Sequence, residues 1–262
     1  MDISKISPIT NNFKRISLKE AEKAQLMQRV DSKYILPFEV SKEVLENVVG
    51  SYFIVDNNGY VVPEYISDYF DTPEFNMYLD HQNKRPRRYK IRVRNYCASG
   101  DSFLEIKLRT PSGKTVKKRI SARTNDLNNE NIIDFVASKS PYIIDELSKT
   151  LVTRFERLTL VSHDFNERIT FDFNLNISLP NTGQSINYEN ISIVEVKRSK
   201  FKSNSEVAKL LKILGFRPKG FSKYSIGCAL LYPNFKSNNF KKTLLYIKKI
   251  KDEYTQPNYA NR

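Results

Sequence analysis

Hydrophobic and polar positions alternate along much of this chain, and the stretch 103–109 (FLEIKLR) shows the pattern clearly. Leu104, Ile106 and Leu108 would lie together on one face of a β-strand, because successive side chains of a strand point to opposite faces. The other face would carry Phe103, Glu105, Lys107 and Arg109. Such a charged face is either solvated or lines a charged cavity.

The same alternation predicts seven further strands, at Arg29–Leu36, Tyr65–Phe70, Tyr89–Tyr96, Thr115–Ile120, Val152–Val161, Arg168–Phe173 and Ile191–Lys197. Helical patterns are expected at 17–27, 40–49, in a short segment from 71, at 121–150 and at 205–214. The first 16 residues are polar and predict a loosely held arm. Most strands are joined as hairpins and the helices come in blocks, so the pattern predicts an α+β domain with a large antiparallel sheet or a barrel.

Long basic side chains dominate one face of strand after strand. Two unit charges about 7 Å apart repel by about 2 kcal/mol at an effective dielectric constant of about 20. A solvated face remains the alternative for any single strand. In a barrel with inward cations, an enclosed polyanion would neutralise this repulsion. Helices packed on the outside of the barrel would bury the apolar face of each strand. The few carboxylates among the cations could then hold a divalent metal.

Composition narrows the possible partners. The chain has 43 Lys and Arg against 29 Asp and Glu, a formal net charge of +14, which attracts nucleic acid, anionic membranes or polyphosphate. Two histidines and two cysteines are too few for a multi-histidine metal site or a disulfide framework. No segment has the apolar run of a signal peptide or a membrane span, so a cytoplasmic location is expected.

The ordered set of motifs resembles the triphosphate tunnel metalloenzyme superfamily, and within it the VTC domain, the polyphosphate polymerase module of the vacuolar transporter chaperone and its bacterial relatives. The segments that carry the resemblance are RVDSKYIL, YFDTPEFNMY, YKIRVRNY, FLEIKLRT, VKKR, FERLTL, RITFDF, IVEVK and FSKYSIG. The resemblance implies a tunnel of eight antiparallel strands. It also implies ATP and inorganic polyphosphate as substrates and Mn²⁺ or Mg²⁺ as the cofactor, with no nucleic acid.

Roles for individual residues follow from the resemblance. Phosphoryl transfer is assigned to Arg92, Arg94, Lys107, Arg157 and Arg168. Phosphate binding extends to Lys33, Arg109, Lys117, Lys197, Lys219 and Lys223. Glu195 is the expected metal ligand, and Glu105 is expected to assist the metal or to orient Lys107. Asp172 is expected to pair with Arg168, and His81 to lie on the surface.

Some positions depart from the superfamily pattern. Related CYTH enzymes open with Glu-x-Glu-x-Lys, whereas this chain has Arg29, Asp31 and Lys33 at that spacing. Fewer metal ligands favour the polymerase branch over a cyclase or a thiamine triphosphatase. Phe155 stands where a tyrosine is expected, and Arg109 stands where some relatives have histidine.

Three functions remain open: polyphosphate polymerase, hydrolase of short triphosphates, and non-catalytic binder of polyphosphate or nucleic acid. The expected organisation is an N-terminal arm and helix over 1–28, a VTC-like tunnel domain over 29–232, and a basic helical tail over 233–262.

Overall fold

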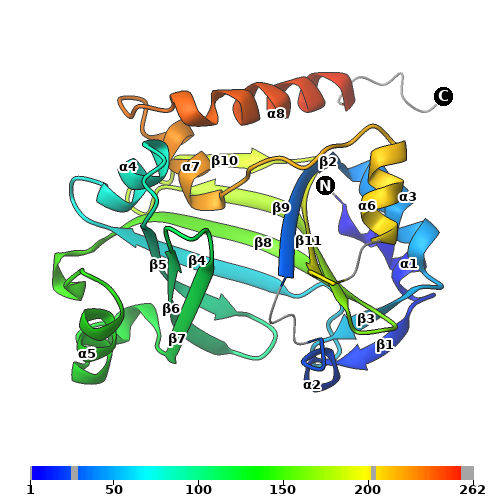
Figure 1. The fold of residues 1–262 in the computed structure, drawn as a ribbon, viewed down its shortest axis with the longest axis horizontal. Coiled ribbons are helices and arrows are strands. Elements are labelled where there is room, and N and C mark those ends of the chain that lie inside the picture. The colour runs from blue at the N-terminus through cyan, green and yellow to red at the C-terminus, as the bar shows by residue number, and fades with distance from the viewer. Residues whose placement is uncertain (1, 25–28, 202–204, 255–262) are drawn as a thin grey trace.

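The computed structural model describes residues 2–24, 29–201 and 205–254 (Figure 1). Its main element is a curled antiparallel sheet with the strand order β2-β11-β9-β8-β4-β5-β6-β7. These strands are β2 (Arg29–Pro37), β4 (Glu64–Asp71), β5 (Arg88–Tyr96), β6 (Asp101–Arg109), β7 (Thr115–Ser121), β8 (Ser148–Ser162), β9 (Glu167–Ser178) and β11 (Ile191–Ser199). The predicted α+β class with eight antiparallel strands is confirmed, and the sheet forms a half-barrel.

Three short strands extend this sheet at its margins. β1 (Lys14–Ser17) pairs in parallel with β3 (Tyr52–Asp56), β3 pairs with β8, and β10 (Ser185–Tyr188) pairs with β9. The helices are α1 (Ser7–Thr10), α2 (Leu18–Ala21), α3 (Phe38–Val48), α4 (Asn76–Gln82), α5 (Glu130–Lys139), α6 (Glu206–Ile213), α7 (Lys223–Leu231) and α8 (Lys241–Tyr254). Short 3₁₀ turns lie at Ile3–Ile6, Thr124–Asp126, Ile144–Glu146 and Asn238–Phe240.

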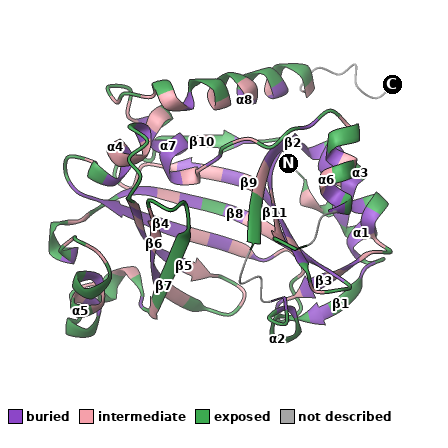
Figure 2. Ribbon diagram, in the orientation of Figure 1, coloured by how far each residue is buried: buried purple, intermediate pink, exposed green. Residues whose placement is uncertain are grey.

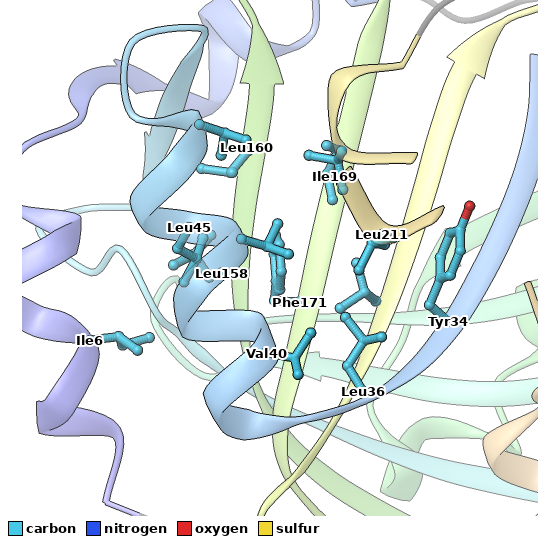
Figure 3. Close-up of a cluster of buried hydrophobic side chains, with 14 of the residues drawn as sticks. Ile6, Tyr34, Leu36, Val40, Leu45, Leu158, Leu160, Ile169, Phe171 and Leu211 are labelled. Carbon is cyan, nitrogen blue, oxygen red and sulfur yellow. The ribbon is translucent and has the colours of Figure 1, made fainter. Parts of the chain in front are cut away.

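One face of the sheet, called here the outer face, is apolar and covered by helices. Figure 3 shows Val40 and Leu45 of α3 and Leu211 of α6 packed against Leu158 and Phe171 of the sheet. At the other end of the sheet, α5 covers β5 and β6 in a second cluster. The period-two alternation thus places the apolar positions under helices, and burial of this surface stabilises the fold.

The opposite face, called here the inner face, carries most of the charged strand residues, and the sheet curls around it. Lys33 of β2 and Lys90 of β5 lie five strands apart, about 24 Å in a flat sheet. Their ammonium groups nevertheless reach neighbouring residues, because Lys33 donates to the carbonyl of Phe221 (3.1 Å) and Lys90 to the hydroxyl of Ser222 (2.8 Å).

Helix α7 packs on the inner face and covers part of it. Tyr224 stacks on Tyr69 of β4, with ring centroids 5.2 Å apart. Gly227 faces the sheet so closely that a Cβ atom would lie 2.6 Å from side-chain carbons of Leu151 and Ile177. Figure 2 shows α7 and the central strands as largely buried, whereas α5 and α8 expose their outer sides. Ile247 and Ile250 on the inward side of α8 join the same apolar cluster as α7.

The terminal segments are more firmly packed than the sequence predicted. The expected loose arm instead buries Ile6, Ile9 and Phe13 in the outer-face cluster, and β1 adds to the sheet. The capping box of Ser17 and Glu20 is present, but α2 ends at Ala21; part of the predicted helix, 25–27, lies outside the described residues. The expected basic helical tail contains the helix α8, which buries Ile247 and Ile250.

Two predicted helix starts were wrong. α3 begins at Phe38, two residues before the expected start at 40. α4 begins at Asn76 rather than near Pro73, although Asp71 still accepts hydrogen bonds from its first turn.

The segment 121–150 contains α5 and short 3₁₀ turns, and β8 already begins within it. The helix α7 (Lys223–Leu231) lies outside the segments in which the sequence predicted helices before the tail.

Candidate anion-binding site

The register of the sheet brings the charged residues of separate strands together on the inner face. Residues directly opposite each other in antiparallel strands share a face. The opposed charged pairs include Arg92 with Glu105, Glu105 with Arg119, Lys90 with Lys107, Lys107 with Lys117, Arg157 with Asp172, Lys33 with Glu195, Lys197 with Asp31, and Lys197 with Arg168.

Glu105 is fully buried and engaged by two cations. Arg92 donates to its Oε2 atom through Nε (2.9 Å) and Nη2 (2.6 Å), and Lys117 Nζ lies 2.5 Å from Oε1. Arg92 also donates to the hydroxyl of Tyr69 (3.0 Å). Burial raises the pKa of the Glu105 carboxyl, but Arg92, Arg94 and Lys107 outweigh that effect and hold it well below its ordinary value. Glu105 therefore orients cations, and its oxygens leave little room for a metal.

A second buried cluster joins β8, β9 and α7. Arg157 contacts Asp172 in a forked geometry, with Nε 2.5 Å from Oδ1 and Nη2 2.8 Å from Oδ2. Lys223, the first residue of α7, also donates to Asp172 and lies 4.2 Å from the ring centroid of Phe155. Burial lowers the pKa of Lys223 to about 8, although Asp172 opposes this effect. The Asp172 carboxylate thus holds two of the predicted phosphate ligands in place, Arg157 of the sheet and Lys223 of α7.

Glu195 lies in a third, more accessible cluster. Its carboxylate is 2.6 Å from Lys197 Nζ and 3.7 Å from Lys33 Nζ, and Lys197 also contacts Asp31 at 3.4 Å. Burial raises the pKa of Glu195, but Lys33 and Lys197 lower it to about 2. Glu195 is therefore ionised throughout the physiological pH range and keeps 20% of its side-chain surface exposed.

Three cations of the inner face, Lys90, Arg94 and Lys107, form no ion pair with a carboxylate among the described residues. Arg94 donates to the hydroxyl of Ser67 (3.1 Å) and lies 5.7 Å from the ring centroid of Phe155. Burial and the nearby Arg92 and Arg157 lower the pKa of Arg94 to about 10. Of the three, Arg94 is buried, and a buried positive charge without a carboxylate partner is costly, so this group of cations favours binding of an anion.

Three predicted phosphate ligands lie at the margins. Arg168 donates to the carbonyl of Ala21 and so turns toward the N-terminal segment. Arg109 is exposed at the end of β6, beside the β6–β7 turn. Lys219 lies over the ring of Tyr246 in α8, 4.6 Å from its centroid, while its backbone N–H donates to the carbonyl of Lys33 (2.7 Å).

One ion-pair prediction was wrong, and His81 is less exposed than predicted. Asp172 pairs with Arg157 and Lys223 rather than with Arg168, since residues four apart in one strand are separated by about 13 Å. The side chain of His81 is only partly exposed; its Nδ1 atom lies 2.5 Å from the hydroxyl of Ser225, and burial lowers its pKa to about 2.

Lys90 and Ser222 also belong to the inner face, although the sequence-based assignment omitted both. The alternation of Lys90 with Arg92 and Arg94 already indicated a shared face, and this signal could have identified Lys90.

The carboxylates of the inner face fit a metal only if substrate oxygens complete its coordination. Within residues 2–24, 29–201 and 205–254, no three His, Cys, Asp or Glu side chains gather as metal ligands. All three carboxylates contact cations, and Glu195 is the most accessible of them, with 20% of its side-chain surface exposed against 3% for Asp172 and 0% for Glu105. Mg²⁺ and Mn²⁺ suit this arrangement, because such ions often bind phosphates through one or two protein carboxylates.

The fold and the site define a protein whose curled antiparallel sheet encloses a cationic inner face. The VTC domain family matches residues 28–232, and the chain belongs to this family. The resemblance inferred from the motifs is therefore confirmed. None of the helices in the described part of the chain is both long enough and apolar enough to span a membrane.

Solved structures with a similar fold include three cyclase-like proteins. A candidate adenylate cyclase from Bacillus halodurans has 13% identity and a TM-score of 0.48, covering 74% of this chain and 94% of its own. A candidate adenylate cyclase from Vibrio parahaemolyticus has 10% identity and a TM-score of 0.44, covering 76% and 97%. A candidate adenylyl cyclase from Hippeastrum, described as having a dominant triphosphatase activity, has 12% identity and a TM-score of 0.43, covering 77% and 96%. A search of curated protein sequences finds no match.

Proposed function

We propose that this protein is a metal-dependent polyphosphate polymerase, which transfers the γ-phosphoryl group of ATP to the end of a growing inorganic polyphosphate chain. Membership of the VTC domain family supports this proposal. The observation that carries it is the gathering of basic side chains on the inner face, among them the buried Arg92 and Arg94, on the same face as the ionised carboxylate of Glu195, which interacts with Lys33, Lys197 and Arg157.

In this mechanism the protein positions phosphates and neutralises their charge. A terminal oxygen of the polyphosphate chain attacks the γ-phosphorus of ATP, the bond from that phosphorus to the β–γ bridging oxygen breaks, and ADP leaves. No nucleophilic side chain is needed, because the acceptor phosphate is the nucleophile. Catalysis of such a transfer rests mainly on positioning and on electrostatic stabilisation.

The arginines supply most of that stabilisation. Arg92 and Arg157 are held in fixed orientations by Glu105 and Asp172, so their remaining N–H groups are preorganised for phosphate oxygens. Arg94 and Lys107 bring positive charge that no acid neutralises.

Glu195 would hold the divalent ion, with the phosphates as its other ligands. A Mn²⁺ or Mg²⁺ ion bound there would neutralise charge on the transferring phosphoryl group. Lys33 and Lys197 currently contact the Glu195 carboxylate, and phosphate oxygens offer these ammonium groups alternative partners.

The test is product analysis with the purified full chain, ATP and Mn²⁺. We expect a polymer that resists nuclease and is degraded by exopolyphosphatase. Glu195→Gln should abolish its formation while the fold is retained, because the amide keeps the shape but not the charge. Lys118→Met is the matched control, since Lys118 lies opposite Ile106 and is exposed on the other face of β7.

Other outcomes would contradict the polymerase proposal. Release of free phosphate alone would identify a triphosphate hydrolase that uses water as the acceptor. Binding of polyphosphate without any turnover, unchanged or strengthened in the Glu195 variant, would identify a non-catalytic binder.

A further inference from the structure

We propose that Lys90 is a further phosphate-binding residue of this site, and that Ser222 holds its ammonium group at the N-terminus of α7. The inference rests on the proposed function, because it takes the ligand to be an inorganic polyphosphate or the triphosphate of a nucleotide. It adds a residue that the family motifs did not assign, and it links β5 to the helix that covers the inner face.

The position of Lys90 follows from the strand. Lys90 is two residues from Arg92 and directly opposite Lys107 of β6, so its side chain emerges on the inner face beside the two cations. Its Nζ atom donates to Ser222 Oγ at 2.8 Å. An ammonium group carries three donors, and this is its only hydrogen bond among the described residues, so donors remain for a ligand.

Ser222 is fixed in place by the start of α7. As the N-cap residue it accepts a hydrogen bond from the backbone N–H of Ser225 (3.2 Å). The hydroxyl of Ser225 donates to Ser222 Oγ (3.2 Å) and lies 2.5 Å from Nδ1 of His81. This series of hydrogen bonds joins β5, α7 and α4, and it restrains the lysine to one place.

The surroundings of Lys90 are strongly cationic. The titratable and charged groups that interact with it or lie opposite it are Lys33 from β2, Arg88 and Arg92 from β5, Lys107 from β6, His81 from α4, and Cys228 from α7. No carboxylate in the described ranges pairs with Lys90. A bound polyanion would place several negative charges among these groups and remove their mutual repulsion.

Proton uptake gives a signature to which this lysine contributes together with Lys223, whose pKa is also lowered. Burial, reinforced by Lys33, Arg88 and Arg92, lowers the pKa of Lys90 to about 7. Above that pH the free protein holds Lys90 largely neutral. Phosphate oxygens favour the charged form and raise its pKa, so binding should draw a proton from the buffer.

The experiment is titration calorimetry of the full chain with inorganic tripolyphosphate at about pH 8, in two buffers of different ionisation enthalpy. Wild type should take up protons on binding. Lys90→Met should bind about ten- to a hundredfold more weakly, the loss expected for a charge-assisted hydrogen bond, and should take up fewer protons. Lys90→Arg stays charged, so it should keep most of the affinity and also take up fewer protons.

Controls separate this inference from the proposed function. Lys118→Met should match wild type in both affinity and proton uptake, and thermal unfolding should show that each variant is folded. If Lys90→Met does not fold, Lys90→Arg decides the question through proton uptake alone. Wild-type binding and proton uptake in both Lys90 variants would overturn the role of Lys90 and leave the proposed function standing. Failure of the wild type to bind tripolyphosphate would overturn both.

Discussion

Arg94 differs from the other buried arginines of the inner face in what its loss would leave behind. Arg92 contacts Glu105, and Arg157 contacts Asp172. Removal of either arginine would therefore leave a buried carboxylate without one of its ion-pair partners. Among the described residues, Arg94 forms no ion pair with a carboxylate and instead donates to the hydroxyl of Ser67 and lies against aromatic rings. Structural and functional contributions can therefore be separated at Arg94.

We predict that Arg94→Met lowers kcat by about 100- to 1,000-fold, as expected for loss of a preorganised charge at the reacting group. Its free energy of unfolding should not fall, because a buried cation repelled by Arg92 and Arg157 is removed. Arg157→Met should lose activity and also up to about 3 kcal/mol of stability, since Asp172 keeps only Lys223. Urea unfolding and steady-state kinetics of both variants test this contrast; equal destabilisation of the two would contradict it.

Helix α7 is the element that joins the apolar and charged parts of the inner face. Its first residue, Lys223, contacts Asp172, and its cap, Ser222, contacts Lys90. One turn further along, Gly227 brings the helix backbone against Leu151 and Ile177. The close approach of helix and sheet that Gly227 allows therefore sets the positions of Lys223 and Ser222.

We predict that Gly227→Ala lowers stability by about 1–3 kcal/mol, because the added methyl group overpacks a filled core. It should also raise the KM for ATP by displacing Lys223 and Ser222. Gly50→Ala is the matched control, since a Cβ there meets nothing within 4 Å. Chemical denaturation and kinetics check both effects, and wild-type stability in Gly227→Ala would show that the close approach is not restrictive.

Across the whole molecule, a net charge of +14 is distributed over the inner face and the surface. Exposed lysines lie along α8, at Lys241, Lys242, Lys248 and Lys249. Surface charges are screened by salt, whereas buried charges are screened much less. The surface charge should therefore mainly affect the association rate of a polyanion, and the charge of the inner face should mainly affect its dissociation rate.

We predict that the association rate of polyphosphate falls at least about tenfold between low and high ionic strength, as in electrostatically steered binding. Arg94→Met should show the same salt dependence of this rate, because it removes one of 43 basic residues, while its dissociation rate increases. Stopped-flow binding with a labelled polyphosphate separates the two rates. An association rate independent of salt would contradict steering by the net charge.

The sequence by itself determined the strands and their faces. Alternation with period two requires only local backbone geometry, so Leu104 and Ile106 could be assigned to the core and Arg92 and Arg94 to a charged face before any neighbour was known. The ordered motifs also identified the family. These properties depend on residues that are close together in the chain.

Only the tertiary structure decided which charges meet. Asp172 pairs with Arg157 and Lys223 because the register of β8 with β9 and the seating of α7 bring them together. Lys90 meets Ser222 because α7, distant in sequence, covers part of the inner face. Such contacts depend on register, sheet curvature and helix position, which long-range packing sets, and no local pattern encodes them.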